Sequence, residues 1–291
     1  MAITNRVFSE TSNAFPETPL TRIAASAINR SRAWVMLIDI AEILNSNRWT
    51  RGLFRRVVFL YRQLSPARPV RAAIAAIGEP FASTLCSMYD NEPQIGAEGK
   101  SYAIDTTTRI DPKQGMWIYQ LLCDAKPDNT LEIGLAYGFS TVYFLAAIQA
   151  NGKGHHVALD PYQDGDHWNG IGLAREKVLG TEQGIFEFSS ENSIQGLTRF
   201  AREDRRFGVI FIDGDHTFDF VLCDFLLASL VCQRGGYIIL DDMWLPSVRR
   251  VASFIRRNRS DFTEIHTRVP NIAVFKMNGP DRRHWQHFVP F

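Results

Sequence analysis

The sequence lacks the marks of a secreted, membrane-spanning or strongly charged protein. Its 291 residues have a formal net charge of +1, which gives no general attraction to nucleic acid or to a membrane surface. The N-terminus has no apolar signal core. The most apolar early stretch, AWVMLIDIAEIL, is about a dozen residues long and contains two acids. We therefore expect neither a transmembrane segment nor a nucleic-acid partner.

Cysteine is also scarce. The chain has four cysteines whose spacing matches no metal site: Cys86, Cys123, Cys223 and Cys232. Scattered cysteines of this kind are typical of reduced core residues. We therefore expect a cytoplasmic protein.

The first part of the chain predicts helices and no strands. From about residue 20 to residue 89, apolar runs are separated by breakers at 45–47 and 65–69. Up to Arg71 there are eleven arginines and four acids, a net charge of +7. We interpret this excess as a solvated helix face or a contact between subunits, with a membrane-surface or polyanion role as the alternative. We expect a helical extension or lid over residues 1–105.

The second part, residues 106–291, begins with a helix expected near Pro112 and then alternates apolar strands with helices. This order predicts an α/β, Rossmann-like sheet that is mostly parallel, with an antiparallel hairpin formed by its last two strands. Such sheets bind ligands at the carboxyl ends of their strands. The seven expected strands are NTLEIG, HHVALD, IFEFSS, FGVIFID, GYIILDD, TEIHTRV and IAVFKM.

Three of these strand ends suggest a nucleoside ligand. In LEIGLAYGFST, Gly134 and Gly138 bracket a turn that lets a ligand approach the backbone. The turn has neither the G-x-G-x-x-G spacing of dinucleotide-binding proteins nor the Lys-Ser/Thr of a phosphate loop. Asp160 ends the next strand and is expected to accept hydrogen bonds from a ribose, or else to cap a helix. Ser193 is expected as a helix N-cap or as a contact to a base.

Two further strand ends suggest a metal and a base. Asp213 ends one strand, and the pair Asp241 and Asp242 ends the next. Carboxylates this close repel one another unless a cation compensates, and an oxygen-only set suits Mg²⁺. His216 follows Asp213 by three residues and could act as a general base. The alternatives are a helix cap at 215–216 and an Asx turn at 241–242.

Taken together, the motifs LEIGLAYGFST, LDPYQ…HWNGIGL, FIDGDHTFDFVLCDF and GGYIILDDMW resemble class I S-adenosylmethionine-dependent methyltransferases. They are most similar to bacterial O-methyltransferases of the catechol and macrocin type. The resemblance covers roughly residues 107–277. It is specific for fold and cofactor and much less specific for substrate.

The resemblance implies a role for each polar strand end. Asp213 and His216 would be catalytic, and a divalent metal, expected as Mg²⁺, would be held by Asp213, Asp241 and Asp242. The implied cofactor-binding residues are Glu132, Gly134, Tyr137, Gly138, Ser140, Asp160, Trp168, Ser193 and Asp213. The arginine-rich segment has no counterpart in the minimal catechol enzyme.

The sequence therefore predicts a methyltransferase that uses S-adenosylmethionine to methylate a hydroxyl of a small molecule, such as a natural-product sugar or a catechol. Two alternatives remain at this stage: an NAD-dependent oxidoreductase, and a non-catalytic module that binds a cofactor or a partner. Trp117, Trp168 and Trp244 are expected either as aromatic walls of the site or as core residues. A homo-oligomer could form through the N-terminal helices.

Overall fold

The computed structural model describes residues 68–291 apart from residue 166. Most of the arginine-rich segment, and with it the expected oligomer contact, lies outside the described residues. Its last part is helical as predicted, with α4 at Arg68–Ala75 and α5 at Phe81–Tyr89. Within residues 68–291, no helix combines the length and apolarity that a membrane crossing needs.

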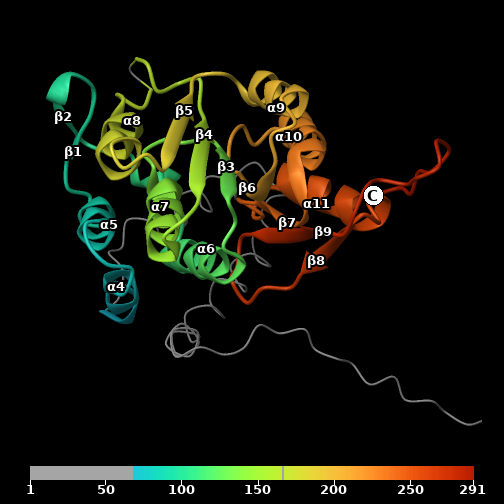
Figure 1. The fold of residues 1–291 in the computed structure, drawn as a ribbon, viewed down its shortest axis with the longest axis horizontal. Helices are drawn as coiled ribbons and strands as arrows, with labels where there is room; N and C mark the ends of the chain where they lie inside the picture. Colours follow the sequence, from blue (N-terminus) through green and yellow to red (C-terminus); the bar gives the residue numbers. More distant parts are fainter. Residues whose placement is uncertain (1–67, 166) are drawn as a thin grey trace, which may run out of the picture.

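A seven-stranded sheet forms the centre of the molecule (Figure 1). Its strands lie in the order β5-β4-β3-β6-β7-β9-β8, and only β9 runs antiparallel to both of its neighbours. The predicted α/β, mostly parallel sheet with a final antiparallel hairpin is confirmed. The strands are β3 Asn129–Ile133, β4 His155–Leu159, β5 Phe186–Ser189, β6 Phe207–Ile212, β7 Cys232–Leu240, β8 Phe262–Ile265 and β9 Ala273–Met277.

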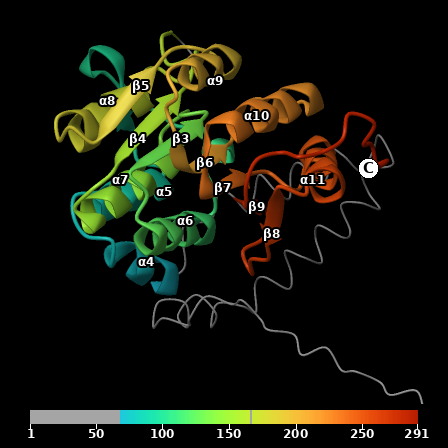
Figure 2. The same cartoon turned by 45° about the vertical axis from the view of Figure 1, so that its right-hand side comes forward.

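Helices cover both faces of this sheet, as the continuous apolar strands predict (Figure 2). One face packs on α6, α7 and α8, which span Pro112–Ala125, Phe139–Asn151 and Ile171–Glu176. The other face packs on α9, α10 and α11, which span Ser193–Arg202, Phe218–Val231 and Pro246–Asn258. The sheet is therefore the middle of three layers.

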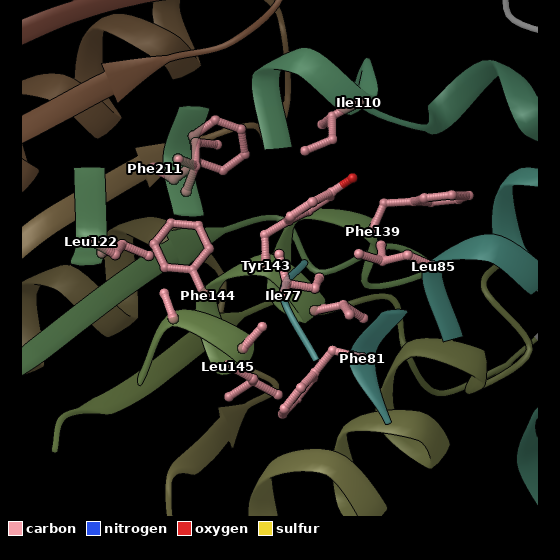
Figure 3. Packing of buried hydrophobic residues seen from close by; sticks show 14 of the residues in the cluster. Ile77, Phe81, Leu85, Ile110, Leu122, Phe139, Tyr143, Phe144, Leu145 and Phe211 are labelled. Atoms are coloured by element: carbon pink, nitrogen blue, oxygen red, sulfur yellow. The ribbon is translucent and has the colours of Figure 1, made fainter. Parts of the chain in front are cut away.

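The helices before residue 90 share the core of the first face. Buried side chains of α4 and α5 belong to the same apolar cluster as those of α6 and α7. Figure 3 shows Phe144 of α7 facing Phe211 of β6, and Tyr143 extending toward Ile110. The Tyr143 hydroxyl donates to the Tyr89 hydroxyl, which in turn donates to the carbonyl of Ile110. These contacts fix the segment that leads into α6.

Local signals explain where α6 begins. Asp111 is its N-cap, Pro112 is its first residue, and Gln114 completes a capping box with Asp111. The helix therefore starts where the sequence predicted it, next to the carboxyl end of β7.

The segment between α5 and α6 contains a small hairpin that the sequence did not reveal. Its strands are only β1 Gln94–Ile95 and β2 Ser101–Tyr102, too short to show an alternating pattern. The hairpin docks on the start of α8, where the amide of Ala97 donates to the carbonyl of Asn169 at 2.8 Å. Arg175 of α8 also reaches Gln94, at 2.9 Å.

Candidate active site

Four polar strand ends lie level at one edge of the sheet. The pairing register places Ile133 of β3 beside Leu159 of β4 and Ile212 of β6, and Ile212 beside Leu240 of β7. The residues that follow these strands, Gly134, Asp160, Asp213 and Asp241, therefore share that edge. This is the edge at which parallel α/β sheets bind ligands.

Two carboxylates converge there on one imidazole. His216 Nε2 lies 3.3 Å from Asp213 Oδ1 and 3.4 Å from Asp242 Oδ2. One ligand atom from each of the three residues falls within 4.8 Å of the others, a spacing that could hold a metal ion. The structure thus brings together three of the residues expected to be catalytic or metal-binding.

The surroundings of Asp213 and His216 raise the pKa of both side chains. Burial raises the pKa of Asp213 to about 6, and the charge of Asp242 adds to the effect. Burial by itself would lower the pKa of His216, but the hydrogen bond to Asp213 and the charges of both carboxylates raise it. Both shifts favour the protonated forms of Asp213 and His216.

The side chain of Asp241 does not join this cluster and contacts α6 instead. Its Oδ1 accepts a hydrogen bond of 2.6 Å from Gln114 Nε2 on α6, and the residue is almost fully buried. The same Gln114 side chain accepts from the amide of Asp111 in the capping box. Asp241 thus ties the end of β7 to the start of α6 and is not one of the three clustered residues.

The remaining partners of Asp242 come from two places in the sequence. Its Oδ1 accepts from the Trp244 indole at 2.8 Å and from Asn271 Nδ2 at 3.1 Å. Trp244 thus contacts the cluster through its indole N–H, and its role as an aromatic wall stays a prediction. Asn271, 29 residues after Asp242, gave no signal, because a lone Asn before a strand is typical of any turn.

The glycine turn is shaped by the protein's own packing. Gly134 has a φ of 96°, and a Cβ there would overlap the backbone carbonyl of Asp213. Gly138 has a φ of 77° and is the N-cap of α7. A Cβ there would lie 2.7 Å from Glu176 Oε1. The turn therefore lies directly against the strand end that carries Asp213.

Two acids expected to bind the cofactor accept hydrogen bonds from this turn and from the start of α7. Glu132 is fully buried and accepts from the hydroxyls of Ser140, at 2.9 Å, and Thr141. Asp160 Oδ2 accepts from the amides of Leu135 and Ala136 at 3.1 and 2.8 Å. Asp160 Oδ2 also accepts from Gln163, and Oδ1 accepts from the amide of Tyr162. Of the two oxygens, Oδ1 keeps acceptor capacity for a ligand.

A group of aromatic rings lies beside the turn. Tyr137, within the turn, meets Trp168 edge to face at 5.1 Å, and Trp168 meets His167 at 4.7 Å. Tyr162, 61% exposed, extends the group toward solvent. The two aromatic residues expected at the cofactor, Tyr137 and Trp168, are thus brought together.

Ser193 is not the N-cap that the sequence suggested. The cap of α9 is Asn192, whose side chain accepts from the amide of Gln195 at 3.0 Å. Asn caps a helix as well as Ser does, so the preceding residue takes the role. The Ser193 side chain instead hydrogen-bonds to Asp224 of α10, which lies close to Gly214.

Comparison with known proteins agrees with this geometry. Residues 131–243 match the family model described as a methyltransferase domain. Over these residues the chain is similar to methyltransferase domains. The fold that the resemblance to class I S-adenosylmethionine-dependent methyltransferases implies is confirmed. The chain matches no curated protein sequence.

Solved structures of methyltransferases share this fold at low identity. The O-methyltransferase TomG from Streptomyces achromogenes, in complex with SAM, is 17% identical, with a TM-score of 0.51. The match covers 71% of this chain and 90% of TomG. Cofactor-bound Rv0187 from MTB is 18% identical, with a TM-score of 0.50, over 76% of this chain and 95% of that one.

Proposed function

We propose that this chain is an S-adenosylmethionine-dependent O-methyltransferase whose acceptor is a hydroxyl of a small molecule, of the sugar or catechol kind. The observation that carries the proposal is the Asp213–His216–Asp242 cluster. It lies at the ligand-binding edge of a methyltransferase domain, directly beside the glycine turn. A base next to the methyl donor is what transfer to a hydroxyl requires.

The cofactor lies over the glycine turn in this proposal. The turn from Glu132 to Ser140 would hold the methionine end, and Asp160 Oδ1 would accept from the ribose. Trp168 and Ser193 would flank the adenine, with the ring of Tyr137 packed against Trp168. Because Gly134 lies against the carbonyl of Asp213, a cofactor held by the turn would present its methyl group beside the cluster. Proximity of this kind supplies much of the rate of a group transfer.

His216 is the general base of the reaction. Its Nε2 takes the proton of the acceptor hydroxyl while the oxygen forms its new bond to the methyl carbon, and the carbon–sulfur bond of the cofactor breaks. Asp213 and Asp242 orient the imidazole. To accept a proton the ring must first be neutral, and the two carboxylates oppose this by raising its pKa.

A divalent ion fits this donor set. Two carboxylates, with an imidazole beside them, present oxygen ligands of the kind that Mg²⁺ prefers. Asp213 and Asp242 would hold the ion, and Asp241 would join them only by giving up its bond to Gln114. Bound there, the ion supplies positive charge that offsets the carboxylates and lowers the pKa of a substrate hydroxyl.

The test compares His216→Gln and Asp213→Asn with wild type. Transfer of a labelled methyl group from S-adenosylmethionine to a panel of catechols and sugars is measured with and without Mg²⁺. We expect both variants to lose about 100-fold or more in kcat. His287→Gln, an exposed histidine in the C-terminal segment, should leave the rate unchanged.

Two results would overturn the proposal. One is wild-type turnover by both site variants. The other is thermal stabilisation of the wild type by NAD but not by S-adenosylmethionine, which would favour the oxidoreductase. Binding of S-adenosylmethionine without turnover of any acceptor would instead favour a non-catalytic module.

A further inference from the structure

The carboxylate of Asp242 has two unlike oxygens. Oδ1 accepts hydrogen bonds from Trp244 Nε1 at 2.8 Å and Asn271 Nδ2 at 3.1 Å, whereas Oδ2 lies 3.4 Å from His216 Nε2. Two donors on one oxygen fix the rotation of the carboxylate group. The other oxygen is thereby directed at the imidazole.

Asn271 makes three contacts to the segment that carries Asp242. Besides donating to Asp242, its Oδ1 accepts from the amide of Trp244 at 2.9 Å, and its carbonyl accepts from the amide of Met243 at 3.1 Å. Both ends of the Asn271 amide group are thus used. A side chain with one donor and one acceptor end, such as Asn, fits this arrangement, and a carboxylate does not.

The topology explains why a residue so far along the chain reaches the site. Asn271 lies two residues before β9, and β9 runs antiparallel to β7 with Ala273 paired to Leu240. The start of β9 therefore lies beside the end of β7. The β8–β9 turn enters the same edge of the sheet as the glycine turn.

The backbone on both sides of the contact is unusual. Asp242 has a φ of 54° and Asn271 a φ of 69°, both in the left-handed region. Asp and Asn are the non-glycine residues that adopt this region most readily. The hydrogen bonds between the two segments hold both residues there.

We propose that Asn271 is a positioning residue of the active site, which, together with Trp244, holds the Asp242 carboxylate so that Oδ2 faces His216. The consequence for metal affinity and turnover rests on the proposed function. The orientation of the Asp242 carboxylate is independent of the proposed function. Residues that orient a ligand in this way typically change metal affinity or activity by about 10- to 100-fold when replaced.

Two substitutions distinguish the contribution of the Asn271 side chain from that of its backbone conformation. Asn271→Asp keeps the size and the acceptor for the Trp244 amide, but places a carboxylate where the donor to Asp242 was. Asn271→Gly keeps the left-handed backbone and removes the side chain. Asn278→Asp is the matched control, because Asn278 is exposed and its amide donates to Thr263 on the same hairpin.

The experiment uses the full chain with Mn²⁺ as the probe. Mn²⁺ affinity is measured by electron paramagnetic resonance, and the Trp244 indole N–H by ¹H–¹⁵N NMR, with its signal assigned through Trp244→Phe. We expect both Asn271 variants to bind Mn²⁺ about 10- to 100-fold more weakly and to shift the Trp244 indole signal. Asn278→Asp should do neither.

The outcomes separate the two proposals. Folded Asn271 variants with unchanged indole signal and unchanged Mn²⁺ affinity would overturn the positioning role. If the wild type binds no Mn²⁺, the metal part of the proposed function fails, and a shifted indole signal with reduced methyl transfer still supports Asn271. Should the Asn271 variants not fold, Trp244→Phe removes the second donor from the same oxygen. Unchanged Mn²⁺ affinity and methyl transfer in that variant would then overturn the proposal.

Discussion

At the scale of single residues, Glu176 is the most exceptional side chain of the described chain. It ends α8, is fully buried, and neither of its carboxyl oxygens has a hydrogen-bond partner. Burial raises its pKa to about 8, with Glu132 adding to the effect and Arg175 opposing it. Arg175 does not neutralise it, because that guanidinium donates to the carbonyl of Tyr137 and to Gln94. Glu176 is therefore protonated at neutral pH.

This protonation makes stability depend on pH. The ordinary pKa of 4.5 applies to the unfolded chain, so between about pH 4.5 and 8 the folded state holds a proton that the unfolded state has lost. Each pH unit in that window lowers the free energy of unfolding by up to about 1.4 kcal/mol. Glutamine cannot ionise, so Glu176→Gln does not lose stability in this way as the pH rises. We expect its melting temperature to exceed that of wild type by more at pH 8 than at pH 5.

Thermal melts of both proteins across that pH range check the prediction. The exposed Glu182→Gln serves as the control and should melt like wild type at every pH. A Glu176→Gln protein whose difference from wild type is the same at pH 5 and pH 8 would contradict the assignment.

Individual residues of the site differ in whether the sequence could predict their roles. Asp213, His216 and Asp242 were predictable because each follows an apolar strand, and parallel strands bring their ends together. The separate roles of Asp241 and Asp242 were not, since adjacent carboxylates look alike until Gln114 and Asn271 select between them. Those two contacts join segments 127 and 29 residues apart, and no local pattern encodes them.

At the scale of elements, the glycine turn and the end of β6 are packed as one unit. Gly134 leaves β3 with a φ of 96°, and its Cα lies against the Asp213 carbonyl. The amide of Asp213 also donates to the carbonyl of Ile133 at 2.9 Å, so the turn that would bind the cofactor and the strand end that carries Asp213 are held side by side. The strands themselves were predictable from their apolar runs, whereas this contact was not.

Gly134→Ala tests this packing. The added methyl group meets the Asp213 carbonyl, and the backbone keeps a conformation that alanine disfavours. We expect a loss of about 2–4 kcal/mol in the free energy of unfolding. Gly152→Ala, at a φ of 65° with open space around it, isolates the backbone cost and should lose about 1 kcal/mol. Chemical denaturation of the two variants measures the difference, and equal losses would refute the clash.

At the scale of the whole molecule, the residues that match the methyltransferase family model do not include the whole sheet. It ends at residue 243, yet β7 pairs along its far side with β9, and Asn271 reaches the site from beyond that limit. A chain ended at residue 258 would keep all the residues of the match and lose β8 and β9.

Such a chain exposes the edge of β7, whose last five residues are all buried in the full protein. An unpaired apolar edge strand is a template for pairing with other chains. We expect the shortened protein to aggregate, or to elute from size-exclusion chromatography well above its monomer mass. A monomeric shortened protein with wild-type methyl transfer would contradict both this expectation and the role of Asn271.

The position of β9 also has a consequence for biosynthesis. The last of the seven strands lies inside the sheet, between β7 and β8, so the ribosome delivers this interior strand after the other six. Until residue 277 has emerged, the nascent chain carries the open flank of β7 and lacks the turn that orients Asp242. A chain whose translation stops early thus exposes an apolar strand edge and lacks the contacts to Asp242, which makes it a substrate for chaperones and proteases.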